Sequence, residues 1–479
     1  MPDISLMGAT YPDVPAVDLP KSGGGTARFT DVSDTTAAAA DVASGKYFYT
    51  DQGVRTAGAA APSNPVAPEN DVIFIDYDGT IRCSYTAADF ANLTALPENP
   101  THGGLTAQGW NWTLADAKTH VATYKRLVIG QNYVTSDGKT RVHIRLSGGR
   151  LSPKLGLCPN GSVDVDWGDG TAHSTVSGNS LTTVVNTEHA YASPGEYVIT
   201  LTVTGSLAIK GTSTAGSALL WKNAGSANEN RPYQSAVKKV ELGENVSLGE
   251  YAFAGCLSLM AVSIPNGLSF GNGAFQSCSA LKALVIRSGV TRTNSSMFVG
   301  CSALQHISVP KSITVLGSSS FQSLAAIQSL PAFDGVTNTG TYQFYGCFSL
   351  SSIEIPESIA TIAANAFNNC TGLGAIHFRN ATPPTVSNSN AFTNLPTDCI
   401  LYVPYSALAA YLSWTSSPSP TTYTYVGYAT YASGATLPTQ DSTQAYNVTW
   451  YATKADAIAQ VNAISTGNGE EIYCRYMAA

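Results

Sequence analysis

The side chains with the most reactive chemistry in this chain are its nine cysteines, five of which recur at one place in a repeating pattern. The five repeat cysteines are Cys256, Cys278, Cys301, Cys347 and Cys370. Thiolates bind zinc or form disulfides, but the chain has no C-x-x-C pair, and an odd total argues against a disulfide framework. The remaining four, at positions 83, 158, 399 and 474, show no pairing pattern. We therefore expect small buried thiols in the repeats, with no cofactor and no metal.

Histidines and carboxylates form no recognisable catalytic motif. The seven histidines lack metal-ligand spacing, and G-x-S-x-G, P-loop and H-E-x-x-H motifs do not occur. Asp164, Asp166 and Asp169 are candidate cation ligands, but they lack the loop pattern and terminal Glu of a calcium site, which favours solvated turn carboxylates. A pair of carboxylates that cleaves a glycan stays an open alternative, because only the fold brings such residues together. The sequence predicts no catalytic, cofactor-binding or metal-binding residue.

One acidic segment has the residue types of a catalytic motif. The apolar run Val72–Ile75 leads into Asp76-Tyr-Asp78-Gly79-Thr80. This resembles the first motif of haloacid-dehalogenase-type phosphatases, which implies Asp76 as nucleophile and Asp78 as general acid around a magnesium ion. Only about 60 residues follow before the next expected domain, too few for the doubly wound sheet of that fold. We therefore favour a strand and a tight Asp-Gly turn, and we expect a protein that is not an enzyme.

The elements that position the repeat cysteines belong to a regular repeat. A phenylalanine returns seven times at intervals of 22 to 25 residues, followed by aliphatic residues at set offsets. The seven are Phe253, Phe275, Phe298, Phe321, Phe344, Phe367 and Phe392. A period in the low twenties predicts a leucine-rich solenoid over residues 237–415, in which the phenylalanines and cysteines form the core and one short strand per repeat builds a parallel sheet. The pattern resembles the bacterial surface-antigen (BspA-like) subtype of leucine-rich repeats, which implies a scaffold and binding surface.

The outward strand positions of the solenoid are mostly small. They are Ser263, Val285, Ser308, Glu354 and His377. We expect a solvated face there without a deep ligand groove, and the receptor contact stays unknown, although the aromatic residues Tyr342, Tyr345 and Phe348 are candidates for a partner contact. Residues 404–414 place Leu408, Tyr411 and Leu412 at helical spacing, which predicts a helix that covers the last repeat.

Residues 141–206 have the alternation of a β-domain. Val142, Ile144 and Leu146 alternate with polar residues, and Asp166-Trp-Gly-Asp-Gly-Thr171 forms a hairpin signal. The segment is similar to the PKD-type immunoglobulin-like β-sandwich, which implies a spacer and adhesive module with Trp167 and Tyr197 in its core.

Composition limits the partners. The 479 residues are 12% charged with a formal net charge of −7, and no basic run occurs, so nucleic acid is not an expected partner. No run of 18 apolar residues occurs, so we expect no membrane insertion.

Residues 35–58 resemble a small module of bacteriophage tail and fibre proteins, carried by Asp41-Val and Gly45-Lys-Tyr-Phe48. Because the first twenty residues also lack a signal-peptide pattern, we expect a structural protein of a virion, a tail or head fibre that docks through its N-terminus, contacts a host surface glycan or protein, and forms a homo-oligomer. A bacterial surface adhesin is the alternative, and a phosphatase or glycan-degrading enzyme is the second alternative.

The expected fold is multidomain and mainly β, with small α+β modules at both ends. The expected domains are an attachment arm with a glycine tether (1–30), the phage-type module and linker (31–62), an unassigned α+β module (70–140), the sandwich (141–206), the solenoid (237–415) and a β-rich, β-grasp-like module (416–479).

Overall fold

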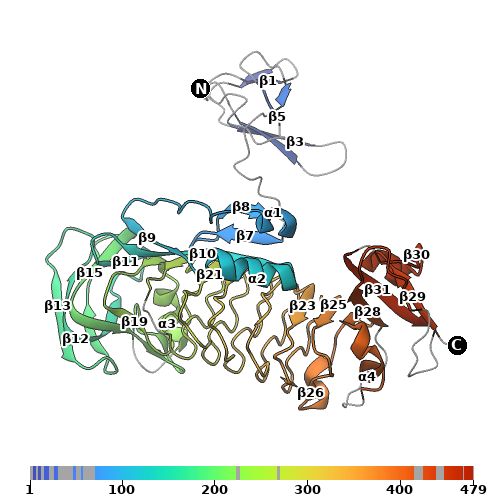
Figure 1. The fold of residues 1–479 in the computed structure, drawn as a ribbon. Coiled ribbons are helices and arrows are strands. Elements are labelled where there is room, and N and C mark those ends of the chain that lie inside the picture. The colour runs from blue at the N-terminus through green and yellow to red at the C-terminus, as the bar shows by residue number, and fades with distance from the viewer. Residues whose placement is uncertain are drawn as a thin grey trace. The chain divides into compact units, whose positions relative to one another are not determined.

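The computed structural model describes residues 71–222, 227–266, 270–414, 424–438, 447–467 and 469–477, with the backbone of six strands nearer the N-terminus. The chain divides into two compact units. The first is Met1–Asn70 with Cys83–Tyr85, and the second is Asp71–Arg82 with Thr86–Ala479. The protein is mainly β (Figure 1).

Three antiparallel strand pairs lie in the first unit. They are β1 (Ile4–Leu6) with β2 (Ala9–Tyr11), β3 (Ala16–Pro20) with β4 (Thr26–Thr30), and β5 (Tyr47–Tyr49) with β6 (Arg55–Ala57). Pro20 and Thr26, at the two ends of the predicted glycine tether, are register partners on β3 and β4. Residues 36–44, within the segment that resembles the phage-type module, lie outside the described residues.

Residues 71–82 and 86–135 form an α+β layer that we call the cover. Its four strands are β7 (Val72–Ile75), β8 (Ile81–Tyr85), β9 (Leu105–Trp110) and β10 (Leu127–Thr135), in the order β8-β7-β10-β9. Its helices are α1 (Ala87–Ala91) and α2 (Leu114–Tyr124). Thr113 is the N-cap of α2, because its hydroxyl accepts a hydrogen bond from the Asp116 amide.

The next strands build one larger sheet. Its members are β11 (Thr140–Leu146), β12 (Lys154–Asp166), β13 (Ser174–Asn179), β14 (Val185–Glu188) and β15 (Gly195–Ile209). The first residues of β12 pair with β14, and its later residues pair with β13 and β15. Alternate side chains such as Val163, Val165 and Leu201 are fully buried, as the period of two predicts.

This sheet runs without interruption into the solenoid. The strand β11 pairs with β15 on one edge and with β18 (Val237–Glu241), the strand that precedes the first repeat, on the other. In addition, β15 pairs in parallel with β19 (Val246–Leu248). Between β15 and β18 lie the short strands β16 (Gly211–Thr212) and β17 (Gly216–Ser217) and the helix α3 (Ala227–Gln234). Residues 141–206 therefore share hydrogen bonds with the repeats, and one continuous core joins the two regions.

The solenoid has about seven turns, and its strands are stacked in parallel. They are β20 (Ala261–Ser263), β21 (Ala283–Val285), β22 (His306–Ser308), β23 (Ser352–Ile355), β25 (Ala375–Phe378) and β27 (Ile400–Pro404). The fourth turn contributes a single bridge from Ser329 to Ser352. Shorter elements on other sides are β24 (Thr361–Ile362), β26 (Thr385–Val386) and the 3-10 helix η2 (Ser389–Phe392).

The repeat phenylalanines form a continuous stack through the solenoid. All seven are buried, and consecutive rings lie 5.3–6.0 Å apart between centroids. The residue two positions after each phenylalanine has a positive φ, and it is Gly, Ser or Asn in every repeat. These positions are Gly255, Ser277, Gly300, Ser323, Gly346, Asn369 and Asn394. Glycine and asparagine tolerate this left-handed conformation, which turns the chain back into the core after each ring.

The repeat cysteines lie beside this stack and are all free. In four repeats the thiol contacts the backbone oxygen of the phenylalanine one turn earlier, as in Cys278 Sγ to Phe253 O at 3.1 Å and Cys301 Sγ to Phe275 O at 3.0 Å. Cys347 and Cys370 repeat this contact. A thiol is therefore more than a small apolar group here, because it donates to a buried carbonyl that would otherwise lose a partner.

We expect the repeat thiols to be unreactive in the native protein. Burial raises the pKa of Cys256, Cys301 and Cys370 to about 12, so thiolate is scarce at neutral pH. Eight of the nine cysteines are buried and only Cys83 is partly exposed, so a thiol reagent should label about one site in native protein and nine after denaturation. Rapid native labelling of repeat cysteines, or linked repeat peptides in non-reducing mass mapping, would contradict this.

The cover lies on the strands of the first repeats (Figure 1). Ile75 of the cover packs on Ala283 and Val285, and Tyr77 and Tyr133 pack on Ala261. Asn111 Nδ2 donates to Ile286 O, and Trp112 Nε1 donates to Val309 O at 2.9 Å. The expectation of a solvated solenoid face is therefore wrong here. Ser263, Val285 and Ser308 are small because a second layer packs on them, and all three are buried.

The last repeats continue into a C-terminal module. After β27, the 3-10 helix η3 (Tyr405–Ala407) and α4 (Leu408–Leu412) form the predicted helix, with Leu408 and Tyr411 buried and Leu412 exposed. This helix does not end the sheet, because β27 pairs in parallel with β28 (Thr424–Thr430). The module adds β29 (Asn447–Tyr451), α5 (Lys454–Ala459), β30 (Ala463–Ile464) and β31 (Glu471–Met477), in the order β28-β31-β29-β30.

Candidate ligand-binding cleft

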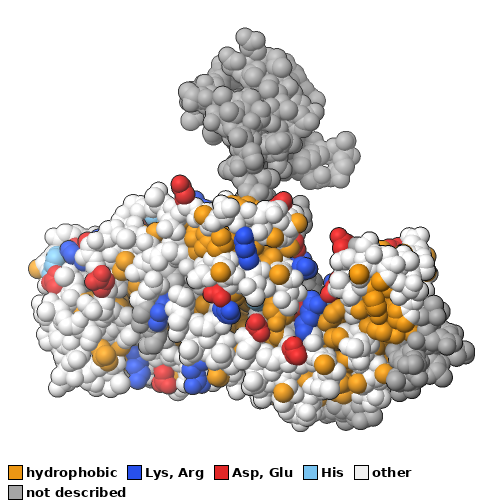
Figure 2. All heavy atoms as spheres, viewed as in Figure 1, with side chains coloured by type: hydrophobic (Ala, Val, Ile, Leu, Met, Phe, Trp, Pro, Cys, Tyr) orange, Lys and Arg blue, Asp and Glu red, His pale blue; other side chains and the backbone are white. Residues whose placement is uncertain are grey.

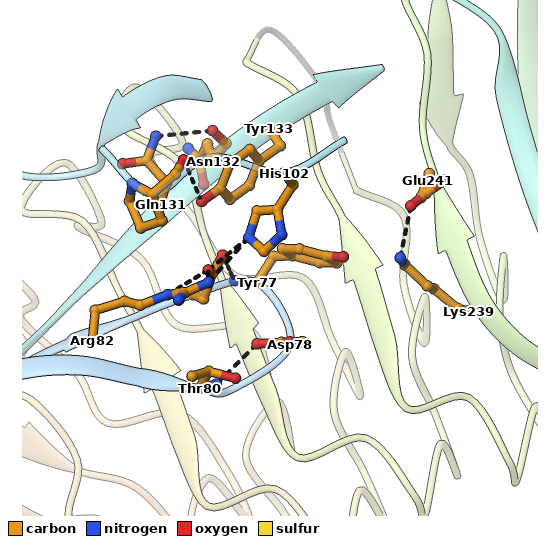
Figure 3. Close-up of polar contacts among 12 residues, drawn as sticks. Tyr77, Asp78, Thr80, Arg82, His102, Gln131, Asn132, Tyr133, Lys239 and Glu241 are labelled. Carbon is orange, nitrogen blue, oxygen red and sulfur yellow. Dashed lines mark hydrogen bonds and ion pairs between the residues drawn. The ribbon is translucent and has the colours of Figure 1, made fainter. Parts of the chain in front are cut away.

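The candidate catalytic carboxylate, Asp76, is fully buried and holds an ion pair. Its Oδ2 accepts hydrogen bonds from Arg82, with Nε at 2.8 Å, and from His102 Nε2 at 2.8 Å, while Oδ1 accepts from the Tyr77 amide. Figure 3 shows Arg82 and His102 directed to the same point beside the ring of Tyr133. Burial alone would raise the pKa of Asp76, but the bonds from Arg82 and His102 outweigh it and lower that pKa.

This arrangement has the geometry of a structural ion pair. Both Asp76 oxygens are already occupied by donors of the protein, whereas a nucleophile needs an oxygen directed at its substrate. Asp78 Oδ1 accepts from the Thr80 amide at 2.9 Å, which is the side-chain contact of an Asp turn. The surrounding sheet has four strands with one parallel pair, β7 and β10, and is not a doubly wound sheet.

The acidic residues of the second sheet contact histidines. His173 Nδ1 lies 2.9 Å from Asp164, and His189 Nε2 lies 2.7 Å from Asp169. Among the residues that the structure describes, no group of three or more His, Cys, Asp or Glu side chains is arranged to hold a metal ion. Trp167 is buried and stacks on His189, whereas the other predicted core residue, Tyr197, is only partly buried.

An open cleft of ≈ 990 Å³ lies over the later repeats. Its floor is the solenoid sheet from Ser329 to Tyr402, one wall is the end of α2, and the opposite wall is the C-terminal module. Figure 2 shows this hollow between the two walls, with basic side chains near its base. The solenoid face therefore forms an open cleft here, because the cover ends before the fifth repeat and the C-terminal module lies beyond it.

Three residues at one repeat position line the centre of the floor. Glu354, His377 and Tyr402 are register partners on β23, β25 and β27, so their side chains project from the same face. The His377 ring stacks on Tyr402 with centroids 4.3 Å apart. Burial first, and then nearby Lys454 and Arg379, lower the pKa of His377 well below its usual value, so the ring is neutral at neutral pH.

An ion-pair network fixes one side of the floor. Arg379 Nε lies 3.0 Å from Glu354 Oε2, and Arg379 Nη1 lies 3.1 Å from Glu471 Oε2 on β31. The guanidinium also lies over the Tyr428 ring at 5.0 Å. The Tyr473 hydroxyl donates to the other oxygen of Glu471 at 2.9 Å. Both carboxylates are therefore held in place by Arg379, and the C-terminal module is tied to the solenoid by the same contacts.

Lys454 is the central cation of the cleft. It is the first residue of α5, whose N-cap is Thr453 as the sequence predicts. Its Nζ lies 3.2 Å from His377 Nε2, 4.9 Å from the Tyr402 ring centroid and 5.7 Å from that of Tyr473. Because His377 is neutral, its Nε2 accepts one ammonium hydrogen, and its Nδ1–H is directed toward Glu354 at 3.6 Å.

Most of these cleft residues could not be assigned from sequence alone. Glu354 and His377 were recognised as outward positions, but Lys454, Arg379 and Arg126 were not. One signal was present: the residue ten positions after the repeat phenylalanine is small in the first three repeats and becomes Glu354, His377 and Tyr402 in the last three. A change from small to large polar residues at one repeat position marks where the covering layer stops.

Residues 228–347 and 337–404 match the family described as the BspA type Leucine rich repeat region, in six copies. These residues form a BspA-type leucine-rich repeat region, as the resemblance predicts. The comparisons give no support to a phage virion protein or a PKD domain. No curated protein matches the chain.

Solved structures similar to this chain include three leucine-rich proteins. A leucine-rich repeat protein from Bacteroides ovatus has 25% identity and a TM-score of 0.30, covering 36% of this chain and 47% of that one. The T. pallidum leucine-rich repeat protein has 25% identity and a TM-score of 0.25, covering 29% and 66%. A leucine-rich cell surface protein from Faecalibacterium prausnitzii has 16% identity and a TM-score of 0.19, covering 48% and 84%. The chain thus spans about half the length of the first.

No helix in the described part of the chain combines the length and apolar character needed to cross a membrane.

Proposed function

We propose that this chain is a non-enzymatic adhesive scaffold displayed on a bacterial cell surface, and that the cleft holds its ligand. The observation that carries this proposal is the position of the cleft on the repeat sheet, between the end of the cover and the C-terminal module. Its volume is that of a pocket for a small ligand or for one or two residues of a polymer. The BspA-type repeats support the bacterial surface over a virion.

Blocking the cleft should abolish adhesion. Ser352 lies on the cleft floor, and Ser352→Trp would place an indole in the ligand space. The matched control is Ser349→Trp, because Ser349 is exposed and does not line the cleft. We expect cell binding of the labelled protein to be lost with Ser352→Trp and kept with Ser349→Trp. Equal binding by both variants would refute the cleft as the adhesive site.

The non-enzymatic part of the proposal concerns Asp76. We expect Asp76→Asn to leave phosphate-ester hydrolysis at the background rate of the unaltered protein, because both carboxylate oxygens are bonded within the protein. The measurement is release of nitrophenol from nitrophenyl phosphate with added magnesium. Turnover that disappears in the variant while its melting temperature is unchanged would establish the phosphatase alternative.

A bacteriophage fibre is the second candidate, favoured by the resemblance of residues 35–58 to a phage module. In this proposal the N-terminal residues dock on the particle, other virion proteins are partners, and residues 141–206 act as a PKD-type spacer. A chain that begins at Asp71 should then fold, because the second unit begins there, yet fail to join particles. Finding the full chain on envelopes of prophage-free cells would exclude the virion.

A further inference from the structure

Two of the cations that line the cleft, Lys454 and Arg126, lack an ion-pair partner among the described residues, and a third, Lys125, donates instead to Ala122 O at 3.2 Å. Arg379, in contrast, contacts Glu354 and Glu471. Lys454 is partly buried, and its polar contact is to neutral His377. An ammonium has three hydrogens to donate, so two of them face ring surfaces and the open cleft. Desolvating a cation without a counter-charge is costly, and an anionic ligand would relieve that cost.

The charged groups around Lys454 act on its pKa in both directions. Burial is the largest cause and lowers the pKa, Glu354 and Glu471 come next and raise it, and Arg379 and Arg126 lower it. Those two carboxylates are already held by Arg379; of the other two that line the cleft, Asp71 accepts from the Ala87 amide at 2.8 Å and Glu470 is exposed and forms no ion pair with Lys454. A ligand carboxylate would therefore be the group that pairs with Lys454.

Arg126 can reach the same space from the other wall. The helix α2 ends at Tyr124 and is followed by its C-cap Lys125, which has a φ of 65° and whose amide donates to Val121 O at 2.9 Å. This sharp turn precedes β10 and leaves the side chain of Arg126 exposed on the cleft wall. Arg126 and Lys454 therefore come from opposite walls, one from the cover and one from the C-terminal module.

The rest of the lining fits a polyhydroxylated ligand better than a peptide. Serine, threonine and tyrosine hydroxyls and carboxylates line the cleft beside the cations, and Leu330 and Ile353 are its only large aliphatic side chains. Sugar hydroxyls need such a mixture of donors and acceptors. An extended peptide would need a free strand edge, but β25, β27 and β28 have bonded neighbours on both sides, and the edge strand β23 is bridged to Ser329.

We propose that the cleft binds an acidic sugar, a uronic or sialic acid residue of a surface glycan, through its carboxylate at Lys454 and Arg126. The inference rests on the proposed adhesive function and names the ligand class of the same site. The hydroxyls of the sugar face Glu354 and the serines of the floor.

The test is calorimetric titration of the full-length protein with glucuronic acid and N-acetylneuraminic acid, with glucose as the neutral probe. We expect at least one acid to bind and glucose not to bind. Lys454→Gln should weaken binding by about tenfold or more, because it removes a charge-assisted contact. Lys222→Gln is the matched control, because Lys222 is exposed and lies outside the cleft, and it should bind as the unaltered protein does.

A second variant distinguishes a loss of binding from a loss of folding. Arg126 is exposed, so Arg126→Gln should keep the melting temperature and still weaken binding of the acid. The proposal is overturned if neither acid binds, if glucose binds equally, or if Arg126→Gln and Lys454→Gln both bind like the control. Binding of an oligoglutamate peptide in place of both sugars also overturns it.

Cell adhesion and acid binding are measured separately, so the adhesive function and the acidic-sugar ligand can fail independently. If Ser352→Trp abolishes cell adhesion but neither acid binds, the cleft is adhesive and the acidic-sugar assignment is wrong. If an acid binds at Lys454 but the protein does not adhere to cells, the ligand class stands and the adhesive function is wrong.

Discussion

Phe321→Ala should lower the free energy of unfolding by ~3–5 kcal/mol, the cost of deleting a buried aromatic ring from a packed core. Phe321 is 0% exposed in the fourth repeat. Its ring lies 5.6 Å from Phe298, 5.4 Å from Phe333 and 6.0 Å from Phe344, so the cavity would interrupt the stack at its middle. Chemical denaturation of both proteins measures the difference.

A matched control tests whether the loss of stability comes from the burial of the ring rather than from the removal of any phenylalanine. Phe348 lies one repeat later and is 47% exposed, so Phe348→Ala should change stability by no more than about 0.5 kcal/mol. Because repeats share one core with their neighbours, Phe321→Ala should shift the whole solenoid transition rather than split it. Equal effects of the two variants would show that the assigned repeat register is wrong.

Gly130→Val should separate the cover from the solenoid. A Cβ at Gly130 would lie 2.4 Å from Val285 Cγ2 and 2.9 Å from Ser308 Cβ, closer than atoms of a packed interface can approach. The backbone of Gly130 is not in the left-handed region, so the steric conflict alone opposes the new side chain. We expect destabilisation of about 3 kcal/mol, at the upper end for overpacking, with faster proteolysis of residues 71–135.

Two variants isolate the contact. Gly103→Val is the control, because no atom lies within 4 Å of a Cβ there, and its effect should be small. In a double-mutant cycle, Val285→Ala should recover part of the stability lost in Gly130→Ala, since it removes the two methyl groups nearest the new Cβ. Strict additivity of the two substitutions would mean that the cover does not pack on β21.

The tight approach at Gly130 also explains why the early repeats have small outward residues. Within a single repeat, the small side chains of Ser263, Val285 and Ser308 cannot be told from those of solvent-exposed positions. They are small because β10 lies directly on them, and Ser308 Oγ donates to Val128 O at 2.7 Å. A surface position and a position under a thin second layer have similar residue preferences, so the repeat pattern alone does not separate them.

The sequence by itself determined the repeat architecture. The period of 22 to 25 residues, the phenylalanine and the cysteine at fixed offsets predict the stacked core, because each repeat is a local unit whose contacts are with its neighbours. The helix starts at Thr113 and Thr453 were also predictable, since N-caps depend on residues within one turn. These features have local causes.

Only the tertiary structure decided where the solenoid is covered and where it is open. The contact of Gly130 with Val285 joins residues 155 positions apart in sequence, and Lys454 reaches His377 across 77 positions. No periodicity records such pairs, because each is set by how a separate layer docks on the sheet. The cleft, its ion pairs and the facing cations Lys454 and Arg126 exist only where the cover ends and the C-terminal module begins, and this boundary depends on packing between distant segments rather than on any local preference.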